Sequence, residues 1–487
     1  MPRHPFALLP VLAIAGAMLV ALLVMAPAYG FHRDELYFIV AGRHPALGYD
    51  DQPPLTPLLS AAAVAVFGLE PWALRILPAL SVAVVAVLAA ATARELGGRS
   101  RSQVLAALVV AVSGYLAAGH LGVTATYDLL AWAAVLWLAS RILAGGDPRL
   151  WLAVGAVAGL GLWNKHLVLF LGFGLAVGLL VHRRDQLRTP WPWAGGLLAL
   201  VIWLPNLAWQ VANGLPQLEM ARRIGANEGG ERAMLLVELL LLVGPLLFPV
   251  TIAGLWQLLR AESLRPFRAL GTAFLAILAA VLVLGGKSYY VVGAVPPLMA
   301  AGAIALDGWL DRGRVRPWIL AGATTGSALI VALLTLPVLP AATLARTPIP
   351  GIYAENAETV GWPELVATVE AAAAGLPADQ RARAVILTAN YGEAAALQLL
   401  GRDLPPVHSG HNAVWRWGPP PDELDVALLV GWNDPVIRSS MFESCTRLAT
   451  VDNAAGVPNQ EQGQPVHVCT GLRRPWSTSW EIVRHLD

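Results

Sequence analysis

The chain has 487 residues, of which 56% are hydrophobic and only 13% are charged, with a mean hydropathy of +0.60 and a formal net charge of +1. A soluble globular protein carries about twice that share of charged residues, so the composition excludes a soluble fold. The near-zero net charge and the lack of a basic run in the sequence argue against nucleic acid as a partner.

Apolar runs of roughly 20 residues, each long enough to cross a bilayer, recur between residues 6 and 340. The first run is longer than the apolar region of a typical signal peptide, so it is interpreted as a retained helix. The sequence predicts an α-helical polytopic membrane protein with about 11 transmembrane helices. The predicted spans are 6–27, 71–93, 103–119, 127–143, 151–164, 167–181, 192–210, 233–258, 269–284, 290–306 and 317–339.

The arginines are concentrated in alternate loops, and this pattern predicts the orientation of the chain. Cytoplasmic loops of membrane proteins are short and rich in Lys and Arg. The predicted N-terminus is therefore cytoplasmic, and the loop after the first span and the tail after residue 340 lie outside. The arginines of the predicted inner loops are Arg94, Arg99, Arg101, Arg141, Arg149, Arg183, Arg184, Arg188, Arg260, Arg265, Arg268, Arg312, Arg314 and Arg316.

Acidic residues stand at two predicted outer edges of the membrane. Asp34 and Glu35 open the stretch "GFHRDELYFIVAGRHPALGYDDQPPLTPLL", and Asp128 follows in "VTATYDLLAW". A carboxylate at membrane depth is unfavourable unless it faces a polar cavity, so these acids favour such a cavity. The alternative is structural: the acids of the first loop lie in the first turn of a solvated interfacial helix, and Asp128 with Thr126 caps the start of its span.

The only two lysines of the chain, Lys165 in "LWNKHLVLF" and Lys287 in "GGKSYYVVG", fall at predicted outer ends of spans. Compact ammonium charges there suit an anionic ligand, and Tyr289 and Tyr290 add hydroxyl donors. Snorkelling lysines and an aromatic belt are the alternatives. Carboxylates can deprotonate a hydroxyl, and cations can stabilise a departing phosphate. The combination therefore predicts transfer of a group from a lipid phosphate to a hydroxyl.

Residues 341–487 contain no spanning run, and they predict a soluble α/β domain that follows a transmembrane domain at 1–340. Residues 383–389 and 425–432 are predicted strands, and 363–376 and 392–401 are predicted helices. Both cysteines of the chain, Cys445 and Cys469, fall in this tail. In an oxidising outer compartment they can form a disulfide; two buried free thiols are the alternative.

Two loops of the tail are rich in aromatic, amide and imidazole side chains, which suit contacts with a carbohydrate. Loops packed against the domain, with no ligand, are the alternative. His408 and His411 have no Cys or acid nearby at ligand spacing, so no metal site is predicted. The loop residues are Asn390, Tyr391, His408, His411, Asn412, Trp415 and Trp417, of which Asn390, Tyr391, His411 and Trp415 are the candidate glycan contacts.

Five motifs occur in a characteristic order: "RDEL" after the first span, "GYDDQPPL", "TYDLL", "WNKH" and "KSYY". In this order they resemble the GT-C glycosyltransferases over about residues 1–340. The nearest branch is family 39, the protein O-mannosyltransferases and lipid A aminoarabinose transferases. The resemblance implies an integral membrane enzyme that transfers a hexose or pentose from a polyprenyl-phosphate donor, with inversion. It also implies that the first outer loop forms helices along the membrane surface.

The resemblance also assigns roles to residues. Asp34 matches the catalytic acid of the first outer loop, with Glu35 beside it, and Asp128 matches the acid at the start of the fourth span. The positions implied for the donor phosphate and sugar are Arg43, Asp51, Lys165, Lys287, Tyr289 and Tyr290. Two departures matter, because relatives often have Lys where Gln52 stands and a basic residue where Tyr37 stands. Donor binding would then rest more on Lys165, Lys287 or Arg43, or donor choice would differ.

The expected partners are a polyprenyl-phosphate-linked sugar, a cell-envelope glycan, lipid or protein as acceptor, and membrane lipids, with no nucleic acid. No cofactor is expected with certainty, and a divalent metal is left open. The expected location is a bacterial plasma membrane, with the C-terminal domain extracytoplasmic. Two other classes of function remain open: a secondary transporter, although the internal symmetry and midplane acids typical of one are not seen, and a non-catalytic glycan-binding or assembly protein on the same scaffold.

Overall fold

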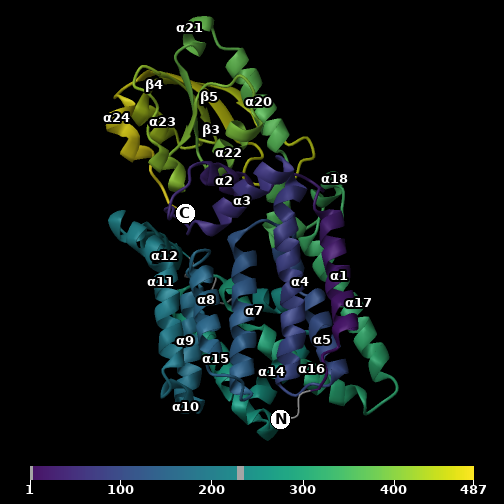
Figure 1. Ribbon diagram of the computed structural model, residues 1–487. Helices are drawn as coiled ribbons and strands as arrows, with labels where there is room; N and C mark the ends of the chain where they lie inside the picture. Colours follow the sequence, from purple (N-terminus) through teal and green to yellow (C-terminus); the bar gives the residue numbers. More distant parts are fainter. Residues whose placement is uncertain (1–3, 228–234, 487) are drawn as a thin grey trace. The chain divides into compact units, whose positions relative to one another are not determined.

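The computed structural model describes residues 4–227 and 235–486, and the chain divides into two compact units (Figure 1). The first, here called the membrane unit, comprises residues 1–26 and 75–336. The second, here called the sheet unit, comprises residues 27–74 and 337–487. The sequence placed the domain boundary at residue 340. The two units of the structure differ from this prediction, because residues 27–74, which follow the first span, pack with the tail.

The membrane unit is built of helices. Their bounds are α1 (Leu8–Met25), α4 (Pro71–Glu95), α5 (Ser100–Ala111), α6 (Tyr115–His120), α7 (Thr124–Leu143), α8 (Leu150–Leu162), α9 (Val168–His182), α10 (Arg184–Leu187), α11 (Trp191–Ala212), α12 (Pro216–Asn227), α13 (Leu235–Val243), α14 (Phe248–Arg260), η2 (Glu262–Phe267), α15 (Arg268–Leu284), η3 (Ser288–Ala294), α16 (Pro296–Leu310) and α17 (Arg316–Thr335).

Among the described residues, six helical segments are long and apolar enough to cross a membrane, or up to eight if each of two bent pairs counts as one span. The bent pairs are α13 with α14, at 98°, and η3 with α16, at 59°. Gly244, at φ +102°, lies at the first break, and Pro296 and Pro297 start α16 after the second. The predicted spans at 103–119, 151–164 and 167–181 correspond to shorter helices, and residues 233 and 234 of another lie outside the described part. The chain is a multi-pass helical membrane protein.

Close backbone contacts between helices hold the membrane unit together. A Cβ atom on Gly155 of α8 would lie 2.0 Å from the carbonyl oxygen of Gly195 in α11. A Cβ on Gly254 of α14 would lie 1.8 Å from the carbonyl oxygen of Leu298 in α16. Small residues let helices approach closely where the surrounding lipid provides no hydrophobic drive for association. Larger side chains at Gly155 or Gly254 would therefore push these helix pairs apart.

The sheet unit mixes short helices with one sheet. Its elements are α2 (Arg33–Arg43), α3 (Leu55–Phe67), α18 (Ala341–Leu344), α19 (Ile349–Ile352), η4 (Ala354–Thr359), α20 (Trp362–Ala374), α21 (Ala378–Arg381), β1 (Ala384–Thr388), α22 (Tyr391–Leu400), β2 (Val407–Ser409), η5 (Asn412–Trp417), β3 (Val426–Val430), α23 (Pro435–Met441), β4 (Phe442–Thr450), β5 (Pro465–Leu472), α24 (Trp476–Ser479) and η6 (Trp480–Val483).

The five strands follow the order β2-β1-β3-β5-β4, with β1 parallel to β2 and β3, and β5 antiparallel to β3 and β4. Every residue of β1 and β3 is buried, as expected for central strands covered on both faces. The α/β character of the tail is confirmed, together with the two strands and two helices predicted there. The sequence analysis missed β2, β4 and β5; β4 is largely exposed at the sheet edge, so it lacks a continuous apolar run.

The helix α2 joins the core of the sheet unit. Its apolar side chains Leu36, Ile39 and Val40 lie in one buried cluster with Trp362 and Leu365 of α20 and with side chains of β1 and β3. This cluster explains why residues 27–74 belong to the same unit as the tail. The short segment that carries the acidic residues is therefore fixed by apolar packing against a folded α/β domain.

Candidate functional site

The first turn of α2 is closed by a reciprocal cap. His32 is the N-cap residue: its Nδ1 accepts a hydrogen bond from the backbone N–H of Asp34 at 3.2 Å, while Glu35 Oε2 accepts from the backbone N–H of His32 at 2.8 Å. Such a box satisfies helix N–H groups that lack a partner within the helix. Glu35 is fully buried in this arrangement. This contact with the backbone of His32 closes the first turn of α2.

The hydrogen bond that Nδ1 of His32 accepts requires the neutral imidazole, with the proton on Nε2 directed at Glu355 Oε2, 2.9 Å away. Burial lowers the pKa of His32, whereas the hydrogen bond to Glu355 and the nearby charges of Asp34 and Glu355 raise it. A second proton would have to go on Nδ1 and would end the hydrogen bond from Asp34, so the cap of α2 holds the neutral imidazole.

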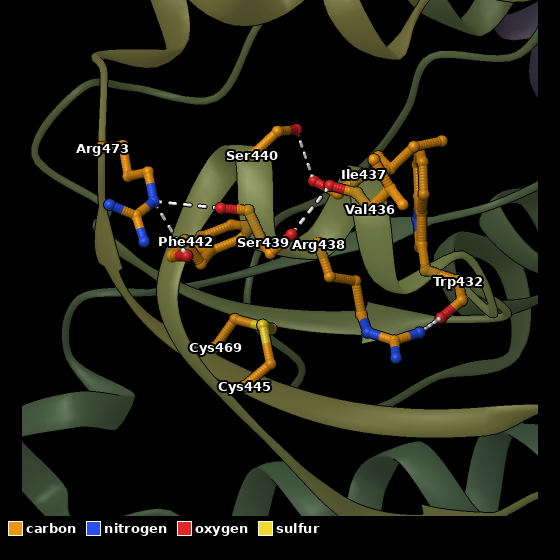
Figure 2. The surroundings of a disulfide bond; sticks show 10 residues. All are labelled: Trp432, Val436, Ile437, Arg438, Ser439, Ser440, Phe442, Cys445, Cys469 and Arg473. Carbon is orange, nitrogen blue, oxygen red and sulfur yellow. Dashed lines mark hydrogen bonds between the residues drawn. A yellow bond between two sulfur atoms is a disulfide. The ribbon is translucent and has the colours of Figure 1, made fainter.

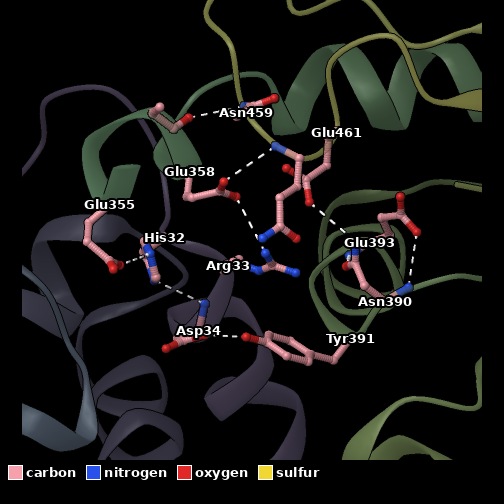
Figure 3. Close-up of polar contacts among 12 residues, drawn as sticks. His32, Arg33, Asp34, Glu355, Glu358, Asn390, Tyr391, Glu393, Asn459 and Glu461 are labelled. Carbon is pink, nitrogen blue, oxygen red and sulfur yellow. Dashed lines mark hydrogen bonds and ion pairs between the residues drawn. The ribbon is translucent and has the colours of Figure 1, made fainter. Parts of the chain in front are cut away.

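Asp34 is held by a residue from the tail. Its Oδ1 accepts a hydrogen bond of 2.8 Å from the phenol of Tyr391, the first residue of α22 (Figure 3). Asp34 is half-buried at the second position of α2, where a carboxylate also benefits from the helix dipole. Among the described residues, its Oδ2 makes no hydrogen bond. One oxygen of this carboxylate is thus fixed, and the other is available for chemistry.

A second acid of the first loop is paired with a second phenol. Asp51 Oδ1 accepts a hydrogen bond of 2.8 Å from Tyr37 of α2. The Tyr37 and Tyr391 rings pack with their centroids 4.7 Å apart. Burial raises the pKa of Asp51 to about 7; the Tyr37 hydrogen bond lowers it, and the charges of Asp50 and Asp34 raise it further. Asp51 therefore changes its protonation near neutral pH, a property frequent among functional carboxylates.

The neighbouring Asp50 anchors the loop to the tail. It is fully buried, and its two oxygens accept hydrogen bonds of 2.7 Å each from Nε of Arg416 in η5. Next to this pair, the His44 ring stacks on Trp417 at 4.3 Å. Pro54 then precedes α3 directly. The loop that carries Asp50 and Asp51 is thus fixed at both ends.

Behind Asp34 lies a buried polar cluster (Figure 3). The Arg33 guanidinium lies 5.0 Å from the centre of the Tyr391 ring and 3.7 Å from Glu358 Oε2. Burial raises the pKa of Glu393 to about 8 and that of Glu461 to about 7, with their mutual repulsion and that of Glu358 adding to the effect. One arginine cannot neutralise three buried carboxylates, so the cluster retains protons near neutral pH.

The membrane unit holds a second polar group around Asp128. This carboxylate is buried in the second turn of α7, and its Oδ1 accepts a hydrogen bond of 3.1 Å from Nε1 of Trp132, four residues later. The charge of Lys165 acts on the same carboxylate. Trp132 is itself fully buried against Gly293 of η3, where a Cβ atom would lie 2.6 Å from the indole. The group is therefore built by α7, η3 and the turn that precedes α9.

Lys165 lies among aromatic side chains. Its Nζ is 3.4 Å from the hydroxyl of Tyr289, 4.7 Å from the centre of that ring and 5.7 Å from the centre of the Tyr290 ring. The two tyrosine rings meet edge to face at 4.8 Å. The preceding Asn164 fixes this turn by donating to the backbone oxygen of Thr124 at 2.7 Å. A half-buried ammonium lined by phenol donors is suited to an anionic group.

Two further residues predicted for the donor phosphate are Lys287 and Arg43. Lys287 is the half-buried N-cap residue of η3, two positions before Tyr289. Arg43 is exposed in the last turn of α2. Gln52 and Tyr37 stand where relatives often have basic residues. Both side chains are buried in the sheet unit, and Tyr37 donates a hydrogen bond to Asp51.

The candidate glycan residues of the tail are largely engaged in packing. Asn390 caps α22 through its bond from the backbone N–H of Glu393. His411 and Asn412 are buried, and His411 stacks on His485 at 4.4 Å. Trp415 donates to the backbone oxygen of Trp480 at 3.2 Å. These contacts favour the packed-loop alternative for these residues.

Cys445 and Cys469 form a disulfide between directly opposed positions of β4 and β5 (Figure 2). Beside it, Arg473 donates from Nε to the backbone oxygens of Ser439 and Phe442, and so holds the end of α23 next to the sheet. Within the described residues, no group of three or more His, Cys, Asp or Glu side chains is arranged to bind a metal ion.

The structure thus groups the predicted residues into two sets. Asp34, Glu35 and Asp51 lie together in the sheet unit, and Asp128, Lys165, Tyr289 and Tyr290 lie together in the membrane unit. Sequence reasoning missed Tyr37 and Arg416 as partners of the acids. It assigned Tyr391 to glycan binding, whereas the phenol bonds Asp34. No local signal in one sequence links residues 357 positions apart.

Comparison with known proteins places this geometry on a known scaffold. The family model described as dolichyl-phosphate-mannose-protein mannosyltransferase matches residues 51–209, less than half of the chain. The structure of ArnT from Cupriavidus metallidurans bound to undecaprenyl phosphate is 16% identical, with a TM-score of 0.61 over 94% of this chain and 97% of that chain. The apo form of ArnT is 17% identical, with a TM-score of 0.62 over the same shares.

The arabinofuranosyltransferase AftD from Mycobacteria is similar in fold at 16% identity, with a TM-score of 0.51; the match covers 95% of this chain and 40% of that one. No curated protein matched the sequence. The chain has the GT-C fold, in the arrangement found in ArnT. The fold expected from the sequence motifs is therefore confirmed.

Proposed function

We propose that the protein is an integral membrane glycosyltransferase that transfers a sugar from a polyprenyl-phosphate donor to an acceptor hydroxyl of the cell envelope, with inversion. The observation that carries this proposal is Asp34. It is a carboxylate at the start of α2 with one oxygen held by Tyr391, in a chain with the GT-C fold. The undecaprenyl phosphate bound to ArnT supports a lipid phosphate as the donor carrier.

In this reaction Asp34 acts as the general base. It removes the proton from the acceptor hydroxyl as that oxygen forms a bond to the anomeric carbon of the sugar. The bond from that carbon to the phosphate oxygen breaks, and polyprenyl phosphate leaves with the electron pair. A phosphate leaves without being protonated, so no general acid is required. The negative charge that grows on it needs a cation.

Lys165 is proposed to supply that cation. Its ammonium donates a hydrogen bond to the hydroxyl of Tyr289, and that hydroxyl keeps its own proton to donate to the phosphate. Asp128 fixes the charge balance around Lys165, and Asp51 binds the sugar. Lys287 and Arg43 are further candidates for the phosphate. The arginine distribution supports a sheet unit on the outer face of a bacterial plasma membrane, with the N-terminus in the cytoplasm.

The proposal is tested with purified full-length protein in lipid nanodiscs. Undecaprenyl phosphate carrying a labelled hexose or pentose is added together with an extract of envelope acceptors. We expect one donor to be consumed, with release of undecaprenyl phosphate and transfer of the label. Donor binding without turnover would instead support a non-catalytic assembly protein. Uptake of the labelled lipid or sugar by sealed vesicles, without transfer, would support a transporter.

A further inference from the structure

The tail contributes one side chain directly to the carboxylate that we propose as the base. We propose that Tyr391 is a positioning residue that orients Asp34 for proton removal. This inference rests on the proposed function. It assigns the C-terminal α/β domain a part in the reaction rather than a separate binding role.

The contact is built from both sides. Asp34 is fixed by the cap of α2 and by the apolar cluster that joins α2 to α20. Tyr391 is fixed as the first residue of α22 by the capping box of Asn390 and Glu393. Two rigid helix starts therefore meet at a hydrogen bond of 2.8 Å. A carboxylate held by rigid elements keeps its geometry better than one on a mobile loop.

The ring of Tyr391 makes further contacts, and the residue is half-buried. It packs on Tyr37 at 4.7 Å, on the His411 ring at 4.8 Å and below the Arg33 guanidinium at 5.0 Å. Its backbone N–H donates to Nδ1 of His411 at 3.3 Å. These contacts leave less of the ring for a sugar to stack on than an exposed aromatic side chain would offer. The role expected from the sequence, a glycan contact, fits the geometry less well than positioning.

The phenol also remains a donor throughout the working pH range. Burial and the negative charge of Asp34 raise its pKa well above the ordinary value of 10.0. A protonated phenol donates to Oδ1 and leaves Oδ2 to accept the proton of the acceptor hydroxyl. Without this bond, the carboxyl group could rotate about its side-chain torsion and misalign Oδ2. Misalignment slows the chemical step without weakening donor binding.

A double-mutant cycle tests the inference. Tyr391→Phe removes only the hydroxyl and keeps the ring contacts. Loss of a hydrogen bond to a charged group corresponds to roughly a tenfold to hundredfold effect, so we expect kcat to fall by that factor with KM for the donor unchanged. In the Asp34→Asn background the same change is expected to alter kcat by less than about twofold, because Tyr391 acts through Asp34.

The control variant is Tyr29→Phe, which removes a phenol in the same unit that donates to the backbone oxygen of Leu339. It is expected to leave kcat at the parent value. Equal fold losses from Tyr391→Phe in both backgrounds, or a loss confined to KM for the acceptor, would overturn the positioning role. If Asp34→Asn turned over at the parent rate, the proposed base would fail, which is a separate result from a parent-like Tyr391→Phe.

If Tyr391→Phe does not fold, a series of fluorinated tyrosines is placed at position 391. Each keeps the shape of the ring and lowers the pKa of the phenol by a different amount. Positioning predicts that kcat changes steadily along the series in the parent and is flat in Asp34→Asn. A flat series in the parent would exclude the role.

Discussion

The two units hold their carboxylates in different ways. In the membrane unit, Asp128 is bonded by Trp132 from one helical turn away, and its surroundings come from helices of the same bundle. In the sheet unit, Asp34 and Asp50 are bonded by Tyr391 and Arg416, which lie 357 and 366 positions further along the chain. The first arrangement depends on contacts within one helix and between neighbouring helices of the membrane unit. The second exists only when the tail is folded against the first loop.

This difference teaches that the tail is part of the acidic site and not an appended module. It also gives a direct expectation. Substitutions in the tail should damage the acidic site, whereas substitutions around Lys165 should affect ligand affinity and leave the sheet unit intact. The experiments below probe the two sides of this comparison, beginning with the largest effect.

Removing the partner of Asp50 should have the largest effect on stability. Arg416→Ala leaves a fully buried carboxylate without its cation, and breaking a buried pair destabilises by about 3–5 kcal/mol. Denaturant titration followed by tryptophan fluorescence measures the change. Arg383→Ala is the matched control, because its ion pair with Asp425 is exposed and should contribute at most about 1 kcal/mol. Equal effects of the two variants would show that the loop is not anchored by the tail.

The disulfide should contribute the next largest share within the tail. Cys445→Ser with Cys469→Ser removes a link across 24 positions, for which the chain-entropy estimate is about 3 kcal/mol. The same denaturant titration measures this loss of stability. The reduced parent protein should have the same free energy of unfolding as the variant. A reduced protein as stable as the oxidised one would contradict the expectation.

The same cysteines also test the orientation. A thiol reagent that cannot cross membranes should label intact cells only after reduction. Labelling that requires cell lysis would place the sheet unit on the cytoplasmic side.

On the membrane side, Lys165→Ala should weaken binding of undecaprenyl phosphate by about tenfold to a hundredfold, the range for a hydrogen bond to a charged group. Lys165→Arg should recover part of the affinity, since the charge is kept while the point-charge geometry changes. Stability of the sheet unit should stay at the parent value. Arg223→Ala, at an exposed pair with Glu219, is the control. Unchanged affinity in Lys165→Ala would return this lysine to a role at the membrane interface.

The smallest effect concerns pH. A carboxyl group whose pKa is raised on folding binds protons more strongly in the folded state, so stability falls as pH rises from its unfolded to its folded pKa. For Glu393 this window runs from 4.5 to about 8. Glu393→Gln keeps the cap acceptor and should reduce the loss of stability between pH 5 and pH 8 by at least about 1 kcal/mol, since one pKa unit is about 1.4 kcal/mol. An identical slope in parent and variant would contradict the raised pKa.

The sequence was sufficient for features that depend on local pattern. The multi-pass helical character, the α/β tail and the motif order follow from apolar runs and from short residue strings. The predicted number of about 11 spans exceeds the six, or up to eight, long apolar segments among the described residues, because several apolar runs form short or bent helices. The sequence set Tyr289 and Tyr290 beside Lys287, and the structure brings Lys165 to the same rings. The bends at Gly244 and before Pro296 were not anticipated, because an apolar run continues across them.

Partnerships across the chain could not be predicted in this way. Tyr391 and Arg416 belong to segments that the sequence analysis interpreted as loops suited to sugar binding. Only the folded structure shows that they bond Asp34 and Asp50. The edge strand β4 was missed for a related reason, because its pairing with β5 rather than its own composition makes it a strand.

The central claim, that Asp34 is the base of a lipid-phosphate-dependent glycosyl transfer, is tested most directly by single-turnover kinetics. The parent, Asp34→Asn and Glu35→Gln proteins are each saturated with the active undecaprenyl-phosphate sugar and mixed with acceptor. We predict that Asp34→Asn binds donor normally and transfers the sugar about 10²–10⁴-fold more slowly, because it cannot take the proton. Glu35→Gln should lose less, since Glu35 caps the helix. Transfer by Asp34→Asn at the parent rate would contradict the account.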